Sequence, residues 1–221
     1  MTLKNNGFIF DLDGTLIDSL TDIALCSNIV LKEFNLPTHE ITEYKYFVGG
    51  GAEVLVNNAI PKGSSNEMAI EVLKRFKQVY DSEFHYNTKP YEGIYDLLDL
   101  LHKNEIKVAI LSNKPHEFTI KYVNEFFPKY TNILEVHGSK DDVPKKPHPH
   151  AALEIAKALE LTCENIYFVG DSDVDMKTAK NSNMKAVGVS WGFRGTKELI
   201  ENGADHIVKT PLDIFELIKK S

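Results

Sequence analysis

The amino-acid sequence predicts an α/β protein: a mainly parallel β-sheet with helices on both faces, and an inserted group of consecutive helices. From residue 90 onward, short apolar runs alternate with segments whose apolar residues recur at helical spacing, as is typical of parallel sheets with crossover helices. Between residues 18 and 86 only helical spacing is found, and no run suits a strand. A block of helices inside a strand–helix protein indicates an inserted helical subdomain.

The first strand and the insertion occupy the N-terminal part of the chain. The apolar run at residues 7–10 predicts a buried strand that ends at the carboxylate Asp11. Helices are then expected at residues 19–34, 41–47, 52–60 and 67–84. Pro37 ends the first helix, and three consecutive glycines at residues 49–51 separate the second from the third.

Strands and helices alternate in the remainder of the chain. Strands are expected at residues 107–111, 132–136, 165–169, 185–189 and 206–208. Helices are expected at residues 94–103, 115–127, 149–161, 174–181, 196–202 and 212–219. This rhythm predicts that most of the strands lie parallel in one sheet.

The composition restricts the classes of function. The chain has 221 residues, of which 43% are hydrophobic and 26% charged, as in ordinary globular proteins. A net charge of −7 without a long basic run argues against a nucleic-acid surface, although an anionic small substrate remains compatible with it. No apolar stretch is long enough to span a bilayer, the N-terminus shows no apolar signal region, and Cys26 and Cys163 lack metal-ligand spacing. We therefore expect a cytoplasmic protein.

Polar residues that suit one site follow several of the predicted strands. They are Asp11 and Asp13, Ser112 and Asn113, Lys145 and Lys146, and Asp171, Asp173 and Asp175. In a parallel sheet all strand ends lie on one edge, which is where ligands bind in open α/β folds. Taken alone, Asp11 and Asp13 also suit a turn before a helix, and Asp171 and Asp173 suit a loop and an N-cap.

The chemistry of such a cluster points to phosphoryl transfer. Carboxylate oxygens suit Mg²⁺, which is held by a few carboxylates together with substrate phosphate. A hydroxyl, an amide and a lysine beside the metal form an anion clamp. One carboxylate can attack phosphorus, and a second can protonate the leaving oxygen and then activate water.

Four segments in this order resemble the motifs of the haloacid dehalogenase-like hydrolases. They are Asp11 to Thr15 (DLDGT), Ser112-Asn113, Lys146-Pro147, and Gly170 to Asp175 (GDSDVD). The resemblance covers most of the chain and implies a Rossmann-like catalytic core at residues 1–16 and 86–221. It also implies a helical cap at residues 17–85.

The same resemblance implies roles for individual residues. Asp11 would be the nucleophile, and Asp13 the general acid and base, with its backbone carbonyl on the metal. Asp11 and Asp171 would be the other metal ligands. Asp175 would contact these ligands or the metal-bound waters without binding the metal directly. A dehalogenase lacks a carboxylate at the position of Asp13, so that activity is disfavoured.

The phosphate-binding residues follow from the second and third motifs. Ser112 and the amide of Asn113 would bind the transferred phosphoryl group, and Lys146 would neutralise its charge, with Lys145 as the alternative. His116 and Arg194 lie near the predicted site in the sequence, and whether they touch substrate stays open.

The cap segment narrows the expected substrate. Residues 46–56 (YFVGGGAEVLV) are similar to a cap segment of phosphoglycolate phosphatases, in which Gly50 and Gly51 would let backbone amides approach a small anion. The resemblance implies an Mg²⁺-dependent phosphatase that cleaves 2-phosphoglycolate through an aspartyl-phosphate. The alternatives are a pyrophosphatase, a broad sugar-phosphate phosphatase or, less favoured, a β-phosphoglucomutase-type phosphosugar mutase.

A regulatory module without activity is disfavoured because Asp11, Asp13 and Lys146 are all present. The expected partner is a small phosphorylated metabolite, with no nucleic acid and no membrane, and the chain is expected to be a monomer or homodimer.

Overall fold

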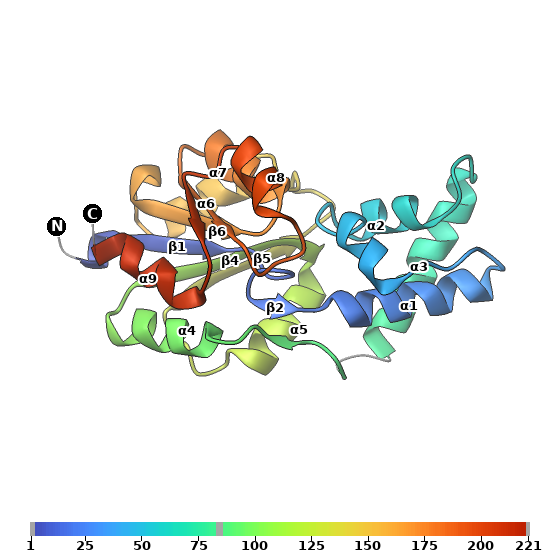
Figure 1. Cartoon of the computed structure of the whole chain (residues 1–221), viewed down its shortest axis with the longest axis horizontal. Coiled ribbons are helices and arrows are strands. Elements are labelled where there is room, and N and C mark those ends of the chain that lie inside the picture. The colour runs from blue at the N-terminus through green and yellow to red at the C-terminus, as the bar shows by residue number, and fades with distance from the viewer. Residues whose placement is uncertain (1–2, 83–85, 220–221) are drawn as a thin grey trace.

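Six parallel strands form the central sheet, in the order β5-β4-β1-β6-β7-β8 (Figure 1). The computed structural model describes residues 3–82 and 86–219. The strands are β1 (Gly7–Phe10), β4 (Lys107–Pro115), β5 (Ile133–Ser139), β6 (Ile166–Gly170), β7 (Lys185–Val189) and β8 (His206–Val208). The first strand lies between β4 and β6, so the chain direction across the sheet reverses beside β1. Ligands bind in open α/β sheets at such a reversal, outside the carboxyl ends of the strands.

Helices cover both faces of this sheet, which confirms the predicted fold class. Figure 1 shows α6, α7 and α8 on one side of the sheet and α4, α5 and α9 on the other. Their bounds are α4 (Ile94–Lys103), α5 (His116–Phe126), α6 (His150–Ala158), α7 (Asp173–Asn181), α8 (Thr196–Glu201) and α9 (Pro211–Lys219). Short 3-10 helices lie at η1 (Leu3–Asn5) and η3 (Cys163–Asn165).

The alternation of side chains along β1 explains why it is buried on both faces. Phe8 and Phe10 point to one face and pack in the apolar cluster that contains Leu97 of α4. Ile9 points to the other face and packs with Ile155 of α6. All three side chains of β1 are fully buried, as expected for the central strand of a sheet covered on both sides.

The inserted helices form a separate lobe at the carboxyl edge of the sheet. Figure 1 shows α1, α2 and α3 together on the right, beyond the strand ends. Their bounds are α1 (Leu20–Glu33), the 3-10 helix η2 (Ile41–Tyr46), α2 (Ala52–Ala59) and α3 (Asn66–Ser82). We call residues 17–82 of this lobe the cap. One apolar cluster runs from the core into the cap, because it contains Phe10 as well as Leu55 and Phe76.

A two-stranded antiparallel ribbon lies where the chain enters the cap and returns from it. It consists of β2 (Ile17–Asp18) and β3 (Lys89–Pro90), which pair with each other. The sequence analysis expected neither strand, because two residues carry no periodic signal. Asp22 of α1 stabilises the return segment by accepting hydrogen bonds from Asn87 and Thr88 at 2.6 to 3.2 Å.

Three predicted boundaries were wrong by several residues. The strand expected at residues 132–136 continues to Ser139. The strand expected at residues 107–111 continues to Pro115, which pairs with Ser139 after an irregularity in the register. The helix expected at residues 149–161 ends at Ala158. The predicted end of the cap helix at Phe84 falls in residues 83–85, outside the described part of the chain.

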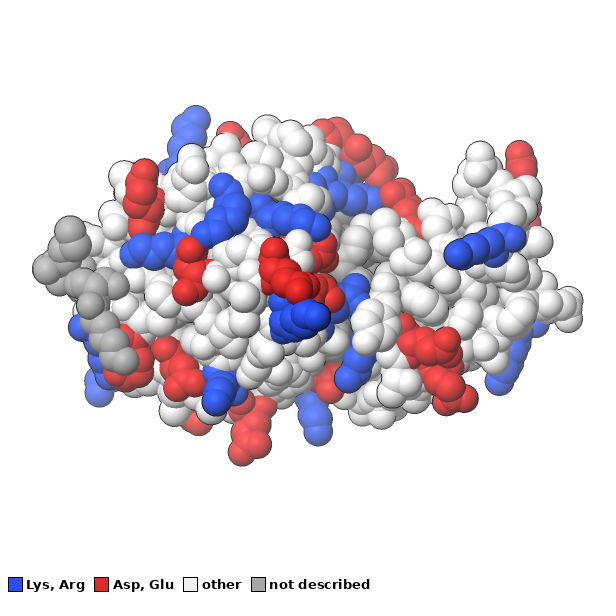
Figure 2. All heavy atoms as spheres, turned by 45° about the horizontal axis from the view of Figure 1, so that its top comes forward, with Lys and Arg blue, Asp and Glu red and all other residues white. Residues whose placement is uncertain are grey.

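Charge is distributed over the surface without concentration of one sign on the face that Figure 2 presents. Basic and acidic side chains are interspersed there over the core. Within residues 3–82 and 86–219, no helix combines the length and the hydrophobicity that a bilayer crossing requires.

Candidate active site

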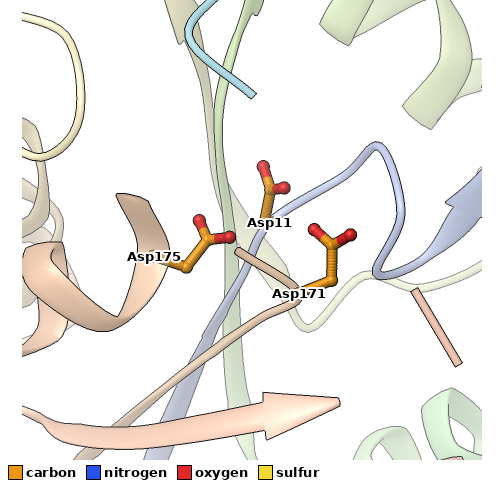
Figure 3. A group of neighbouring side chains, drawn as sticks. All are labelled: Asp11, Asp171 and Asp175. Carbon is orange, nitrogen blue, oxygen red and sulfur yellow. The ribbon is translucent and has the colours of Figure 1, made fainter. Parts of the chain in front are cut away.

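Three buried aspartates come together at the carboxyl edge of the sheet. Asp11 follows β1, Asp171 follows β6, and Asp175 lies in the first turn of α7. Each offers an oxygen within 4.8 Å of the others, and Figure 3 shows the three carboxylates pointing to the same side. The backbone N–H of Asp11 donates to Val169 at 2.9 Å, so pairing with the neighbouring strand fixes where this aspartate leaves the sheet.

A buried lysine neutralises part of this charge. Lys146 Nζ lies 2.8 Å from Asp11 Oδ1 and 2.7 Å from Asp175 Oδ1. Burial alone would lower the pKa of Lys146, but the two carboxylates outweigh it and raise this pKa above its ordinary value. Burial raises the pKa of Asp11 to about 7, although Lys146 acts in the opposite direction.

Lys146 pairs with Asp11 and Asp175, and no lysine or arginine among the described residues forms an ion pair with Asp171. Burial, together with Asp175 and Asp11, raises the pKa of Asp171 well above its ordinary value. The backbone N–H of Phe193 donates to Asp171 Oδ2 at 2.6 Å and holds the carboxylate in place. Gly14 is required beside it, because its φ is +86° and a side chain there would collide with the Asp171 carboxylate.

The donor set fits a hard divalent cation. Three carboxylates face one lysine, which leaves an excess of negative charge in a buried place. Carboxylate oxygens in small number are the usual protein ligands of Mg²⁺. The pKa values of Asp11 and Asp171 are raised because their negative charges are buried next to other carboxylates. A bound cation would offset these charges and lower both pKa values.

Asp13 lines the same cavity as Asp11 but is not a member of this cluster. Its carboxylate accepts from Ser19 Oγ at 2.5 Å and from Lys114 Nζ at 3.0 and 3.2 Å. The sequence analysis assigned the metal contact of Asp13 to its backbone carbonyl, and that assignment stays a prediction. Separate surroundings for Asp11 and Asp13 are what two carboxylates with different roles require.

Ser112 and Asn113 lie in the C-terminal half of strand β4 and line the same cavity as these two aspartates. The Asn113 carboxamide binds the backbone of Lys146 from both sides: Oδ1 accepts from its N–H at 2.9 Å, and Nδ2 donates to its carbonyl at 3.0 Å. Asn113 Nδ2 also donates to the Gly49 carbonyl of the cap at 3.0 Å. The side chain of Asn113 therefore orients Lys146 and joins core to cap. The Ser112 Oγ accepts from the Lys114 N–H at 3.2 Å, and Ser112 is almost fully buried.

A cavity lies between these core residues and the cap. Its polar floor includes Asp11, Asp13, Ser112, Asn113 and Asp171. Its cap wall includes Ile23, Lys45, Val48, Gly49, Gly51, Leu55 and Phe76. The cavity volume is about 60 Å³, against roughly 10–15 Å³ for one water by the same kind of measure. This corresponds to room for several water molecules.

The predicted cap glycines differ in position. Gly51 lines the cavity, and a side chain there would meet the Asn113 carbonyl at 2.9 Å. Gly50 is not among the lining residues, and a side chain there would meet Val54 of α2, the helix that follows it. Gly51 also has a φ of +90°, which favours glycine over other residues.

The structure separates the residues whose roles were left open. Lys145 forms an exposed ion pair with Glu53 of the cap at 2.6 Å, so Lys146 is the lysine of the buried site. Arg194 lines the cavity and donates to the cap carbonyls of Lys45 and, at 3.2 Å, Val48. His116 lies outside the cavity lining, and its Nδ1 accepts from Gly138 N–H at 3.2 Å.

Sequence reasoning gave no role to three residues at this site. Lys114 contacts Asp13, the Tyr80 hydroxyl of α3 accepts a hydrogen bond from Lys114, and Lys45 lines the cavity from the cap. Lys114 was visible only as the residue after Ser112-Asn113. Tyr80 and Lys45 lie in segments whose helical spacing does not distinguish a residue of the site from any other residue of the cap.

A parallel α/β core whose strand-end aspartates face an inserted helical cap defines a class of capped hydrolases. Residues 8–189 match the family model of the haloacid dehalogenase-like hydrolases, and the chain belongs to this family.

Named relatives refine this placement. The chain is 34% identical over 191 residues to a phosphoglycolate phosphatase of Pseudomonas putida, covering 84% of this chain and 69% of that one. It is 26% identical over 218 residues to a phosphoglycolate phosphatase of Nitrosococcus oceani, covering 96% of both.

Two solved structures have the same fold as this chain over nearly its whole length. One from Lactobacillus delbrueckii subsp. bulgaricus, provisionally named a phosphoglycolate phosphatase, has a TM-score of 0.90 at 30% identity and covers 97% of this chain and 98% of its own. A predicted phosphoglycolate phosphatase from Haemophilus somnus has a TM-score of 0.89 at 26% identity, covering 98% and 99%. The chain is thus a haloacid dehalogenase-like hydrolase similar to phosphoglycolate phosphatases.

Proposed function

We propose that the protein is an Mg²⁺-dependent phosphatase that hydrolyses 2-phosphoglycolate to glycolate and phosphate. The observation that carries the proposal is the pairing of Asp11 with Lys146 at the floor of a capped cavity. A carboxylate at such a floor can reach a phosphorus atom, and the buried ammonium and Ser112 can bind the transferred group.

In the first step, an oxygen of Asp11 attacks phosphorus and the bond from phosphorus to the ester oxygen breaks. Asp13 gives its proton to the departing glycolate oxygen, and an aspartyl-phosphate remains on Asp11. Lys146 Nζ, 2.8 Å from Asp11 Oδ1, offsets the negative charge on the transferred group.

In the second step, Asp13 takes a proton from water, and the oxygen of that water forms a bond to phosphorus. The bond between phosphorus and Asp11 breaks, which regenerates the carboxylate and releases phosphate. Asp13 thereby returns to its protonated form. Closure of the cap would exclude water during the first step, and its opening would admit water for the second.

Asp11, Asp171 and the Asp13 carbonyl would hold Mg²⁺, with Asp175 behind them, and the ion would offset charge on the phosphoryl oxygens. The buried cluster of Asp11, Asp171 and Asp175 supports this assignment.

The carboxylate of 2-phosphoglycolate would face the cap. Lys45 lines the cavity there, and among the described residues no Asp or Glu forms an ion pair with it. The backbone of Gly49 and Gly51 borders the same space. A cation and close backbone suit a small second anion.

The proposal includes the predicted division into a core at residues 1–16 and 86–221 and a cap at residues 17–85. The ribbon of β2 and β3 supports it, since the chain leaves and re-enters the core there. A cytoplasmic location is also proposed, and the thiol state of Cys26 and Cys163 is compatible with it.

Steady-state kinetics on a panel of phosphate esters tests the assignment. We expect kcat/KM for 2-phosphoglycolate to exceed that for pyrophosphate and for hexose phosphates by at least about tenfold. A flat profile would contradict the substrate while leaving the chemistry intact. Asp11→Asn is expected to lower kcat by at least about 10⁴-fold. The matched control is Asp173→Asn, because this aspartate is half-buried and pairs only with Lys177 in the described structure.

A further inference from the structure

We propose that Lys114 is a positioning residue for Asp13, and that Tyr80 of the cap holds Lys114 in place. This inference rests on the proposed function, because it concerns the residue that would carry the proton. It assigns a role to a lysine outside the four motifs and connects the cap to the acid–base group.

The contacts of Lys114 are specific and buried. Its Nζ lies 3.0 Å from Asp13 Oδ1, 3.2 Å from Asp13 Oδ2 and 2.8 Å from the Tyr80 hydroxyl. The side chain of Lys114 is 5% exposed and that of Asp13 is 10% exposed, so solvent screens their ion pair very little.

Two aromatic rings also lie next to the Lys114 ammonium. Lys114 Nζ lies 4.7 Å from the ring centroid of Tyr80 and 4.8 Å from that of Tyr122, which are cation–π distances. The hydroxyls of Tyr80 and Tyr122 are 2.9 Å apart. Tyr80 belongs to cap helix α3 and Tyr122 to core helix α5, so the lysine sits at a junction between the two lobes.

The geometry favours positioning over direct binding of substrate. A lysine ammonium has three N–H donors, and Asp13 and Tyr80 together offer three acceptor atoms within 3.2 Å. Little hydrogen-bonding capacity is left for a phosphoryl oxygen. Ser19 Oγ restrains the same carboxylate at 2.5 Å from Asp13 Oδ1, so the orientation of Asp13 is set from two sides.

If Lys114 positions Asp13, the loss of activity in a Lys114 variant should depend on the leaving group of the substrate. A proton from Asp13 is needed when an alkoxide such as glycolate departs, whereas p-nitrophenolate departs without one. A variant that misplaces Asp13 should therefore impair the alkyl ester far more than the aryl ester. Loss of phosphate binding would impair both alike.

The experiment compares kcat/KM for 2-phosphoglycolate and p-nitrophenyl phosphate in wild type, Lys114→Met and Tyr80→Phe. This parameter reports steps up to departure of the leaving group, so slow hydrolysis of the aspartyl-phosphate does not mask the effect. For Lys114→Met we expect a loss of about 10- to 100-fold on the glycolate ester and less than about threefold on the aryl ester. Tyr80→Phe keeps the ring and should show the same pattern at about three- to tenfold.

Lys121→Met is the matched control. Lys121 also joins α5 to α3, but it does so through an exposed ion pair with Asp81 at 3.3 Å and not through Asp13 or Tyr80. Both esters should be cleaved within about twofold of wild type by this variant.

The outcomes separate the two proposals. Equal losses on both esters, or no loss in Lys114→Met and Tyr80→Phe, would overturn the positioning role while the phosphatase assignment stands. If Lys114→Met does not fold, Tyr80→Phe decides alone, because it removes one hydroxyl. A wild-type protein that cleaves neither ester would overturn the proposed function, and the positioning role with it.

Discussion

Asp175 binds Lys146 through one carboxylate oxygen and caps its own helix through the other. Oδ1 lies 2.7 Å from Lys146 Nζ, while Oδ2 accepts from Ser172 N–H at 3.1 Å and Ser172 Oγ at 2.6 Å. The start of α7 and the position of the buried ammonium therefore depend on the same side chain.

This double role predicts that Asp175→Asn changes the Mg²⁺ dependence of the activity. The asparagine keeps a capping oxygen but loses the charge that holds Lys146 and repels Asp11. We expect the Mg²⁺ concentration for half-maximal activity to rise about 10- to 100-fold, with fold retained by circular dichroism. Asp173→Asn, two residues away and paired with Lys177, serves as the control. An unchanged Mg²⁺ dependence would show that Asp175 is only a helix cap.

The close approach of cap and core at Gly51 leads to a second prediction. Gly51 and Gly63 both have a φ of +90°, but a side chain at Gly51 would meet the Asn113 carbonyl, whereas Gly63 faces open space. Gly63→Ala should cost only the backbone strain, about 1 kcal/mol in urea unfolding. Gly51→Ala should in addition lower kcat/KM by at least about tenfold, because the loop must move away from Asn113. Equal activity of the two variants would contradict the importance of this contact.

The parts of the site that sequence reasoning recovered are those carried by local patterns. Phe8 to Phe10 form an apolar run that stops at Asp11, and a strand that ends in a carboxylate is visible without any knowledge of the fold. Parallel pairing then puts Asp11 and Asp171 at one edge, which the register of β1 and β6 bears out.

The parts that were missed depend on distant contacts. Ser112 to Lys114 read as the residues after a strand, yet β4 continues through them because Pro115 pairs again with Ser139 of β5 after an irregularity in the register. The side chain of Asn113 finds its partners in Gly49 and Lys146, 64 and 33 residues away. Lys114 is 101 residues from Asp13. No local period encodes such pairs, so the role of Lys114 could not be inferred before the cap was placed.

Lys45 provides a test of substrate recognition. If it binds the carboxylate of 2-phosphoglycolate, Lys45→Met should raise KM for this ester by about 10- to 30-fold with little change in kcat. The KM for p-nitrophenyl phosphate, which has no carboxylate, should change less than about twofold. Lys62→Met, in the exposed loop between α2 and α3, is the control. A parallel rise of KM on both esters would place Lys45 near the phosphoryl group instead.

Thermal unfolding tests the proposed metal site through its pH dependence. The pKa of Asp11 is raised to about 7, so without a cation this group favours the folded state at low pH, and that contribution is lost as the pH rises towards 7. Mg²⁺ binds the ionised carboxylate and competes with the proton. Millimolar MgCl₂ should therefore raise Tm more at about pH 8 than at about pH 5.5. The difference should disappear in Asp11→Asn, and a shift that is the same at both pH values would contradict a site that contains Asp11.

Asp22, which binds the segment that returns from the cap, should show the opposite pH dependence. Burial by itself would raise its pKa, but the hydrogen bonds from Thr88 and Asn87 outweigh burial and lower the pKa below its ordinary value. A carboxyl with a lowered pKa in the folded state contributes stability above its unfolded pKa, and this contribution is lost as the pH falls through the folded value.

Asp22→Asn should therefore reduce the free energy of unfolding by about 1–3 kcal/mol near pH 7, and by less as the pH falls below about 4. Urea unfolding of wild type and variant across this range measures the difference. Asp142→Asn, in an exposed loop, should leave stability nearly unchanged at every pH. Because Asp22 joins α1 to the segment that returns from the cap, its loss should also loosen residues 87–90, which faster amide hydrogen exchange there would report. A cost that stays constant down to about pH 3 would show that the charge of Asp22 contributes nothing beyond its shape.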